Sequence, residues 1–398
     1  MTKRSWCLVV STVLLLRAGG AGADANVLDP AQLATVDPGA APGSEEVFTL
    51  AEQWTLECGD DPRFMLGVVN EAAATREGAI LLVDRPLGHV LMVGADGACL
   101  GVRGRTGDGP GELRALFCAA GLDDGRIVLS EGMPPFVFGT GAGKVVILDG
   151  EGLPVGGFDL QDPALGNVFP TLRGLRARGE RLLVGLQSTV VRPPQMTSIN
   201  RLLLTGLDGA TVAVLGDRRI ESSFLDTELR EADVFEPYTL DRFDLAGDGR
   251  VAFAPERDAY LVVIVDPATG EGLRVVREIA GRRRTEAERE SLAEANGGAG
   301  VDYIACESDP VIRGLRFRPD GCLWVALGRD EAAPADEFGT FDEIGPDGAW
   351  RRRIRLRAPG DAGDDRLIML QDGRFVRVAG VADAGLGDEG IAVQLLAK

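Results

Sequence analysis

Short apolar runs recur along the chain, and each has about the length of one β-strand. Runs such as residues 79–83, 145–148 and 261–265 are rich in Val, Ile and Leu. Asp-Gly pairs separate many of them, and both residues tolerate the positive φ of a tight hairpin turn. These pairs begin at Asp96, Asp124, Asp149, Asp208, Asp248, Asp320, Asp347 and Asp372. The pattern predicts an all-β protein built from consecutive hairpins.

The turns recur with a period of about 45–65 residues, which defines a unit of four strands. The clearest copy has strands at residues 238–245, 249–254, 260–266 and 272–279. Six units fit the chain, but the last has only three strands, and an unassigned strand at 47–57 precedes the first. An extra first strand and a missing last strand are what a closed ring requires, because closure hides the sheet edges. The sequence therefore predicts a six-bladed β-propeller of four-stranded antiparallel blades, closed by the N-terminal strand 47–57. Two tandem β-sandwiches are the alternative, which the three-plus-one strand count disfavours.

Three segments resemble a known group of proteins. They are DGACLGVRGRTGDGPGEL at 96–113, TEAERESLAEANGG at 285–298 and GDEGIAVQLLAK at 387–398. They resemble the blade junction, the helical insertion and the closing strand of secreted bacterial six-bladed propellers of NHL-repeat or TolB-like architecture, although the closing strand lacks the usual aromatic residues. The resemblance covers residues 47–398 and implies the fold, whereas it says little about activity.

The N-terminus has the features of a secretory signal peptide at residues 1–23. Lys3 and Arg4 precede an apolar run at 6–16 that is too short to span a membrane, and an A-x-A site ends at Ala23. Cleavage after Ala23 predicts a secreted or periplasmic protein. Residues 24–46 are then expected to be disordered or extended. The one short helix is expected inside an insertion at 281–298, where Thr285 and Glu288 form a capping box.

Composition excludes several functions. The 398 residues include 61 acidic and 42 basic side chains, which gives a net charge of −19 and disfavours nucleic-acid binding. His89 is the one histidine, so multi-histidine metal sites are excluded, and no cofactor or metal is expected. Removal of residues 1–23 would leave five cysteines, an odd number with no C-x-x-C motif. Cys306 and Cys322 are the closest pair in sequence and a candidate disulfide, but the pairing stays open.

The channel of the propeller is the expected functional place. Counting back from the turn glycine of each first strand, positions four and six are mostly large and apolar, which predicts packing between blades. These residues are Leu175, Leu245, Phe317, Met369, Phe243, Leu315 and Leu367. Positions five and seven would then face the channel, and they include Ala73, Ala120, Leu172 and the small Gly174 and Gly314.

Five of these channel positions are charged, and they form the predicted ligand-binding site. They are Glu71, Arg242, Asp244, Arg316 and Arg366. Three guanidinium groups against two carboxylates would make a locally positive site in an acidic protein, suited to carboxylate, sulfate or phosphate groups. The alternative is a hydrated channel in which these charges simply pair with one another.

The sequence therefore predicts a non-catalytic, secreted binding or interaction module, monomeric, with an anionic small ligand or an unknown protein as partner. Long insertions at 190–199, 281–310 and 330–338 could present a loop face to such a partner. The alternative is a metal-dependent lactonase-like or lyase-like enzyme with its site in the channel. That chemistry needs more inward Asp, Asn or His side chains than Glu71, Asp244 and Asn70 supply. The glycine-rich stretch at 104–112 is expected to be an inter-blade turn, since a phosphate-binding loop would need a helix after it.

Overall fold

The computed structural model describes residues 26–38, 44–58, 61–132, 143–160, 168–223, 226–234, 240–297, 302–328, 333–380 and 392–398. The expected signal peptide, residues 1–23, lies outside this described part. Among the described residues, no helix is both long and apolar enough to cross a membrane.

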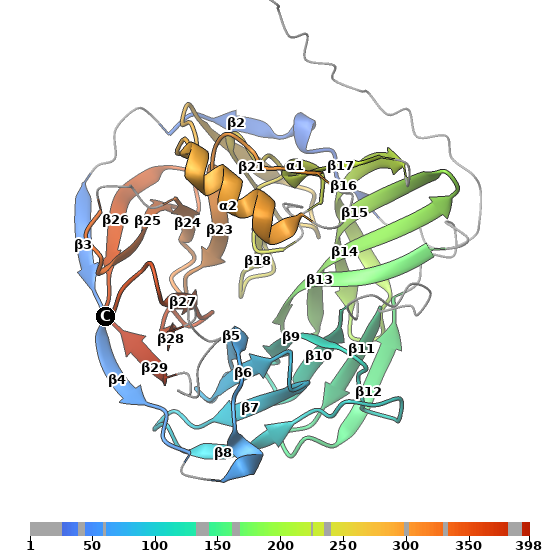
Figure 1. Cartoon of the computed structure of the whole chain (residues 1–398), viewed down its shortest axis with the longest axis vertical. Helices are drawn as coiled ribbons and strands as arrows, with labels where there is room; N and C mark the ends of the chain where they lie inside the picture. Colours follow the sequence, from blue (N-terminus) through green and yellow to red (C-terminus); the bar gives the residue numbers. More distant parts are fainter. Residues whose placement is uncertain are drawn as a thin grey trace, which may run out of the picture.

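Six sheets surround a central axis, which confirms the six-bladed β-propeller (Figure 1). The first two blades are β5 (Val69–Ala74), β6 (Ile80–Asp84), β7 (His89–Val93) and β8 (Cys99–Arg103), then β9 (Leu116–Gly121), β10 (Ile127–Glu131), β11 (Lys144–Leu148) and β12 (Pro154–Asp159). Blades 3 and 4 are β13 (Val168–Arg178), β14 (Arg181–Arg192), β15 (Gln195–Gly206) and β16 (Thr211–Ser223), then β18 (Phe243–Leu245), β19 (Val251–Phe253), β20 (Tyr260–Val265) and β21 (Gly272–Arg277). Blade 5 is β23 (Ile312–Phe317), β24 (Leu323–Leu327), β25 (Glu337–Ile344) and β26 (Trp350–Arg357), and blade 6 is β27 (Arg366–Met369), β28 (Phe375–Ala379), β29 (Ala392–Ala397) and β4 (Ala51–Thr55). Within each blade the neighbouring strands run antiparallel, and the first strand in each of these series lies nearest the axis.

The hydrophobic core is divided among the interfaces between blades. Strand β6 shows why: Leu81 and Val83 pack in the cluster shared with blade 2, whereas Ile80 and Leu82 pack in the cluster shared with blade 6. Both faces of a blade meet a neighbour, so a strand in the middle of a blade is apolar on both sides. All seven positions predicted to pack between blades do so.

The same arrangement corrects part of the channel prediction. Ala73, Ala120 and Leu172 were expected to face the channel, but each packs in a hydrophobic cluster between blades. The alternation along an inner strand decides mainly which neighbouring blade a side chain meets, because the channel borders the edge of the sheet.

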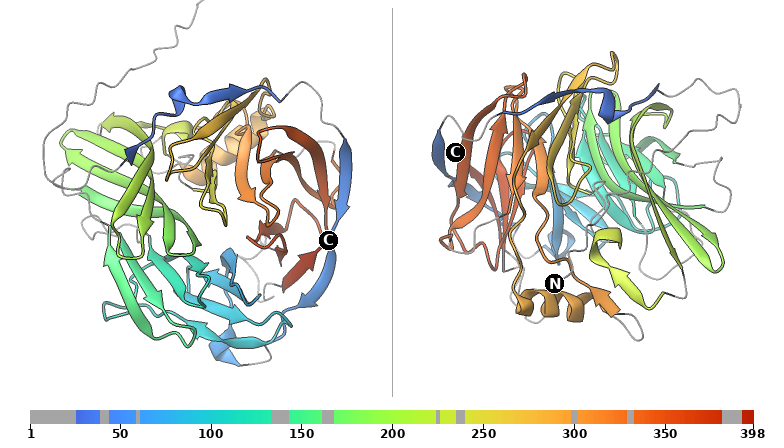
Figure 2. Two further views of the ribbon diagram at one scale, coloured as in Figure 1. Left: turned by 180° about the vertical axis from the view of Figure 1, so that it is seen from behind. Right: turned by 90° about the horizontal axis from the view of Figure 1, so that it is seen from above.

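A strap of four strands at the N-terminal end runs round the outside of the ring (Figures 1 and 2). Strands β1 (Asn26–Val27), β2 (Ala34–Val36) and β3 (Glu45–Thr49) each add a parallel fifth strand, to β16, β21 and β26 respectively. Strand β4 instead pairs antiparallel with β29 and completes blade 6. The N-terminal closure of the ring is therefore confirmed, with β4 within the predicted range 47–57.

Side chains of the strap fill gaps between blades. Phe48 and Leu50 belong to the core between blades 5 and 6, and Trp54 belongs to the core between blades 6 and 1. The indole N–H of Trp54 donates to the carbonyl oxygen of Ala95, in the β7–β8 turn of blade 1, at 3.0 Å. The strap thus links the last blade to the first by packing as well as by backbone pairing.

The inner hairpins of five blades end in the same five-residue turn. The fourth residue is a glycine with a φ between 82° and 91°, which side chains rarely permit. Arginines from three of these turns donate to the carbonyl oxygen of the turn glycine in the next blade. These pairs are Arg250 with Gly321, Arg318 with Gly373 and Arg374 with Gly78. The turns therefore hold neighbouring blades together at this face of the ring.

The insertions differ from simple loops. Residues 190–199, expected as a loop, form the end of the long β14–β15 hairpin. Helix α2 (Glu286–Asn296) has the predicted Thr285 capping box and lies on one face of the ring (Figure 2). Beside it, β17 (Glu228–Arg230) pairs with β22 (Asp302–Ile304), and α1 (Glu231–Val234) follows β17. The stretch 104–112 leads into β9 and not into a helix, which confirms an inter-blade turn.

A disulfide joins Cys58, which follows β4, to Cys99 at the start of β8. The bridge considered between Cys306 and Cys322 was wrong: neither forms a disulfide, and neither does Cys118. Sequence proximity favoured that pair, whereas ring closure brings Cys58 and Cys99 together from different blades. The disulfide therefore fixes the closing segment to blade 1.

We expect the double variant Cys58→Ser/Cys99→Ser to lose about 4 kcal/mol of unfolding free energy. The bridge closes a loop with a sequence separation of 41, and removing it restores loop entropy to the unfolded chain. Urea unfolding without reductant measures the loss. Cys306→Ser is the matched control and should change stability little, because Cys306 forms no disulfide and is only partly buried. Equal stability of the double variant and the control would contradict a stabilising role.

Candidate functional site

Four of the six inner strands have an irregularity, which lies at the second residue of β5, β9 and β23 and in the middle of the longer β13. In β5, β9, β13 and β23 the register shifts by one residue, and the residue left without a paired neighbour is Asn70, Phe117, Arg173 or Arg313. Such bulges bend a strand and redirect a side chain. These four inner strands thus carry a bulge but are otherwise regular.

Arg176 of β13 is buried, and it is the centre of a group of charges in the channel. Its guanidinium nitrogens lie 3.4 Å from Glu71 Oε1, 3.4 Å from Asp241 Oδ1 and 3.5 Å from Asp244 Oδ1. Arg176 is only 3% exposed, and it also lies over the ring of Phe243. Arg176 therefore contacts carboxylates from blade 1 and from blade 4, which lie on opposite sides of the channel axis.

Arg316 extends this group to blades 5 and 6. Its Nη1 lies 3.6 Å from Asp244 Oδ1, and its Nε donates to the carbonyl oxygen of Met369 at 3.4 Å. Asp244 Oδ2 in turn accepts a hydrogen bond of 2.7 Å from the backbone N–H of Phe317. We call Glu71, Arg176, Asp241, Asp244 and Arg316 the channel cluster.

Burial shifts the protonation equilibria of this cluster. It raises the pKa of Glu71, an effect that Arg176 opposes, and it raises the pKa of the neighbouring Cys118 thiol. Burial also lowers the pKa of Arg316, and the like charge of Arg176 adds to the effect. Burial lowers the pKa of Arg176 as well, but its carboxylate partners together have the larger effect, so its pKa is raised overall. Arg176 is therefore well compensated, whereas Arg316 is not.

The structure brings three of the five predicted site residues into the channel cluster, namely Glu71, Asp244 and Arg316. Arg366 is exposed at the start of β27 and lies beside Arg316 in a cavity described below. Arg242 is buried before β18 and donates to the carbonyl oxygen of Glu256 in the loop after β19.

Arg176 was missed because of a different turn in blade 3. Gly179 lies in a two-residue turn between Arg178 and Arg181, whereas the other inner hairpins have five-residue turns. In blade 3 the glycine thus lies directly after the inner strand and not four residues beyond its end. The positions counted back from Gly179 are therefore not equivalent to those counted in the other blades. The signal was in the local alternation: Leu175 and Ala177 are apolar and pack between blades, which leaves Arg176 on the other side of the strand.

A cavity of about 200 Å³ lies between the inner strands of blades 5 and 6, next to the channel cluster. Its charged lining consists of Arg313, Arg316, Arg366 and Asp241, and its apolar lining includes Trp324 and Phe341. We call this cavity the arginine slot. Arg366 makes no hydrogen bond or ion pair with the described residues, and Arg313 pairs with Asp309 outside the slot at 3.1 Å. The positive character of the slot therefore comes mainly from Arg366, because Arg313 and Arg316 each have a carboxylate partner, Asp309 and Asp244 respectively.

A second pair of arginines lies near the mouth at blades 1 to 3. Arg85 stacks on the ring of Phe117 with its guanidinium carbon 3.8 Å from the ring centre. Burial lowers the pKa of Arg173, and the like charge of Arg85 lowers it further. Two close cations with little compensation extend the positive character round the mouth.

The described residues contain no group of three or more His, Cys, Asp or Glu side chains arranged to hold a metal ion. His89, on β7, is not part of the channel cluster. The fold and the site together define a six-bladed β-propeller with an arginine-rich channel mouth.

No family model and no curated protein sequence matches this chain. Among solved structures, the chain is similar to a protein described as exported from Bacteroides fragilis NCTC 9343, with 10% identity, a TM-score of 0.47 and coverage of 89% of this chain and 98% of that one. It is also similar to a DUF4221-family member from Bacteroides vulgatus ATCC 8482, with 7% identity, a TM-score of 0.48 and coverage of 87% and 97%. For the calcium-binding protein regucalcin from Agrobacterium tumefaciens, identity is 12%, the TM-score 0.42 and coverage 88% and 95%. At TM-scores below 0.5 these likenesses carry no argument about function.

The raised pKa of Glu71 predicts a pH-dependent contribution to stability. Folding favours the protonated form, so the contribution is full below the ordinary pKa of 4.5 and is lost as pH rises through the raised pKa. Glu71→Gln is neutral at every pH, and it should therefore gain stability relative to the wild type as pH rises. Urea unfolding of both proteins at pH 4 and pH 7 measures the change. The exposed turn variant Glu77→Gln is the control, and an unchanged difference between Glu71→Gln and wild type at the two pH values would contradict the prediction.

Proposed function

We propose that the protein is a secreted, non-catalytic binding module that holds a small organic anion in the arginine slot at the channel mouth. The carrying observation is the lining of the slot, where Arg313, Arg316 and Arg366 meet a single carboxylate, that of Asp241. Guanidinium groups bind carboxylate, sulfate and phosphate groups through paired hydrogen bonds. The apolar part of the lining suits a ligand with a small flat body.

The energetics of Arg316 support an anion in this place. Its guanidinium is mostly buried, with 16% of the side chain exposed, and the carboxylate with which it forms an ion pair, that of Asp244, lies 3.6 Å away and also faces Arg176. A buried cation with partial compensation gains from an added anion, because the charge then recovers part of its lost hydration energy. Arg316 is therefore the member of the channel cluster that would gain from an anion in the slot.

Nearly all the residues that line the slot lie on paired strands, and such rigid support favours ligand binding. Arg316 lies on β23, Arg366 on β27, and the backbone N–H of Phe317 is fixed by Asp244 at 2.7 Å. Side chains held on paired strands lose less conformational freedom when a ligand binds. Secretion is supported by the N-terminal sequence, in which Lys3 and Arg4 precede an apolar run and an A-x-A site.

We expect benzoate and phenyl phosphate to bind the wild-type protein at millimolar concentration and to raise its melting temperature. Arg366→Gln should weaken binding about tenfold, since a hydrogen bond to a charged group contributes about 1.5 kcal/mol or more. Isothermal titration calorimetry measures the affinity. Arg366 is exposed and has no partner among the described residues, so its replacement should leave stability unchanged.

Gly314 offers a matched pair of variants for the same test. A Cβ there would lie 3.7 Å from the carbonyl oxygen of Asp241 and 3.8 Å from Ala326, which is ordinary contact. Gly314→Ala should therefore bind the anions like wild type, whereas Gly314→Leu should fill the slot and abolish binding. Failure of both anions to bind wild type, or equal binding by the two Gly314 variants, would overturn the proposal.

A further inference from the structure

A second, larger cavity lies at the outer side of blades 4 and 5, where the strap passes. Its volume is about 500 Å³, which is within the usual range for small-molecule sites. It is bounded by the segment after β21, by strands β24 to β26 of blade 5, and by β3 of the strap. None of its lining residues belongs to the arginine slot. We call this cavity the strap pocket.

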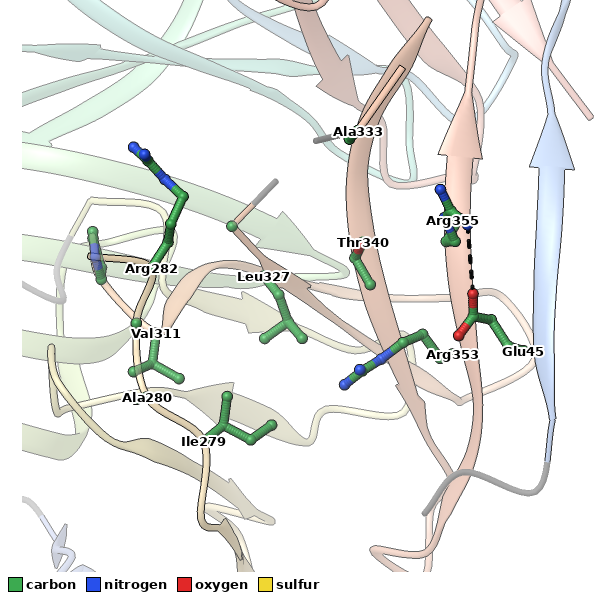
Figure 3. Close-up of a pocket in the computed structure, with 13 residues that line it drawn as sticks. Glu45, Ile279, Ala280, Arg282, Val311, Leu327, Ala333, Thr340, Arg353 and Arg355 are labelled. Atoms are coloured by element: carbon green, nitrogen blue, oxygen red, sulfur yellow. Dashed lines mark ion pairs between the residues drawn. The ribbon is translucent and has the colours of Figure 1, made fainter. Parts of the chain in front are cut away.

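One side of the strap pocket is apolar. Ile279, Val311 and Leu327 line it, and all three pack on the hydrophobic core between blades 4 and 5. The other walls present the guanidinium groups of Arg282, Arg353 and Arg355. In Figure 3, Arg353 extends from β26 towards Ile279 and Leu327, and Arg282 lies on the opposite side of the pocket. The pocket therefore combines an apolar floor with cationic walls.

The carboxylates that pair with these arginines lie deep in blade 5 or beside α2. Asp342 is fully buried and is shared by Arg353, at 2.9 Å, and by Arg277, whose contact is closer. Glu337 is 1% exposed and accepts from Arg355 at 2.6 Å. These carboxylates hold the arginines in place from behind, and Asp342 shares one negative charge between two cations.

The carboxylate at the rim of the pocket is Glu45, on strap strand β3. Its Oε1 lies 3.8 Å from Arg355 Nη1, which is an ion pair beyond hydrogen-bond distance, and its side chain is 53% exposed (Figure 3). Such an exposed, long pair contributes little to stability. Glu45 thus occupies, from within the chain, the position that the acid group of a ligand would take.

We propose that the strap pocket binds a small organic acid with an apolar body, whose acid group meets Arg353 and Arg355 in competition with Glu45. The apolar body would contact Ile279, Val311 and Leu327. Inorganic anions would fill only the charged part, so burial of the apolar floor sets the preference for an amphipathic acid. The site is built jointly by two blades and the strap, and it is independent of the arginine slot.

Octanoate is the probe for this proposal, with isothermal titration calorimetry as the readout. Arg353→Gln should weaken octanoate binding at least tenfold, because a hydrogen-bonded charge is removed. Glu45→Gln should tighten binding about two- to five-fold, since it removes a competing carboxylate from an exposed ion pair. Glu45 is exposed on the strap, so this variant tests the proposal even if Arg353→Gln fails to fold.

A further variant separates the strap pocket from the arginine slot. Gly314→Leu, which fills the arginine slot, should leave octanoate binding unchanged. Loss of octanoate binding in Gly314→Leu, weaker binding in Glu45→Gln, or no binding by wild type at millimolar concentration would overturn the inference, while benzoate binding in the slot would remain a separate result.

Discussion

Ring closure is the constraint on which the rest of the structure depends. Each blade buries both of its faces against neighbours, so an open array would expose two complete apolar faces. The pairing of β29 with β4 prevents this, because it completes blade 6 with a strand from the other end of the chain. Trp54 and the Cys58–Cys99 disulfide then fix that strand to blade 1. Backbone pairing, side-chain packing and a disulfide therefore all stabilise the junction between blades 6 and 1.

The candidate site is a consequence of that closure. Six inner strands converge on one axis, and charges that are distant in sequence meet there. Arg176 contacts Glu71 and Asp244 only because blades 1, 3 and 4 share the channel. Loss of Arg176 would be costly, since it would leave the carboxylates of Glu71 and Asp244 without their shared cation in a buried place. The channel cluster thus holds the ring at its axis, and Arg316, at its less compensated end, faces the slot.

Much of the fold could be predicted because its signals are local. Asp-Gly turns and apolar runs marked the hairpins, and the three-stranded last unit indicated closure. The parallel strap strands β1 and β2 could not be predicted, since a short fifth strand depends on an edge that is distant in sequence. At the site, Glu71, Asp244 and Arg316 followed from regular counting, whereas the shorter turn at Gly179 hid Arg176. The Cys58–Cys99 disulfide could not be predicted either, because ring closure brings together two cysteines from different blades.

Opposite electrostatic effects act on an anion that approaches this protein. The net charge of −19 repels it at long range, and screening confines that repulsion to a distance of about 8 Å at physiological ionic strength. Within the slot, Arg313, Arg316 and Arg366 act at contact distance in a partly buried place, where salt screens little. A highly charged polyanion would meet the full surface repulsion on approach and would gain contacts for only one of its groups. A small acid with a single charged group and an apolar body would meet less repulsion and use both kinds of lining, so the acidic surface is consistent with the ligand class proposed for the slot.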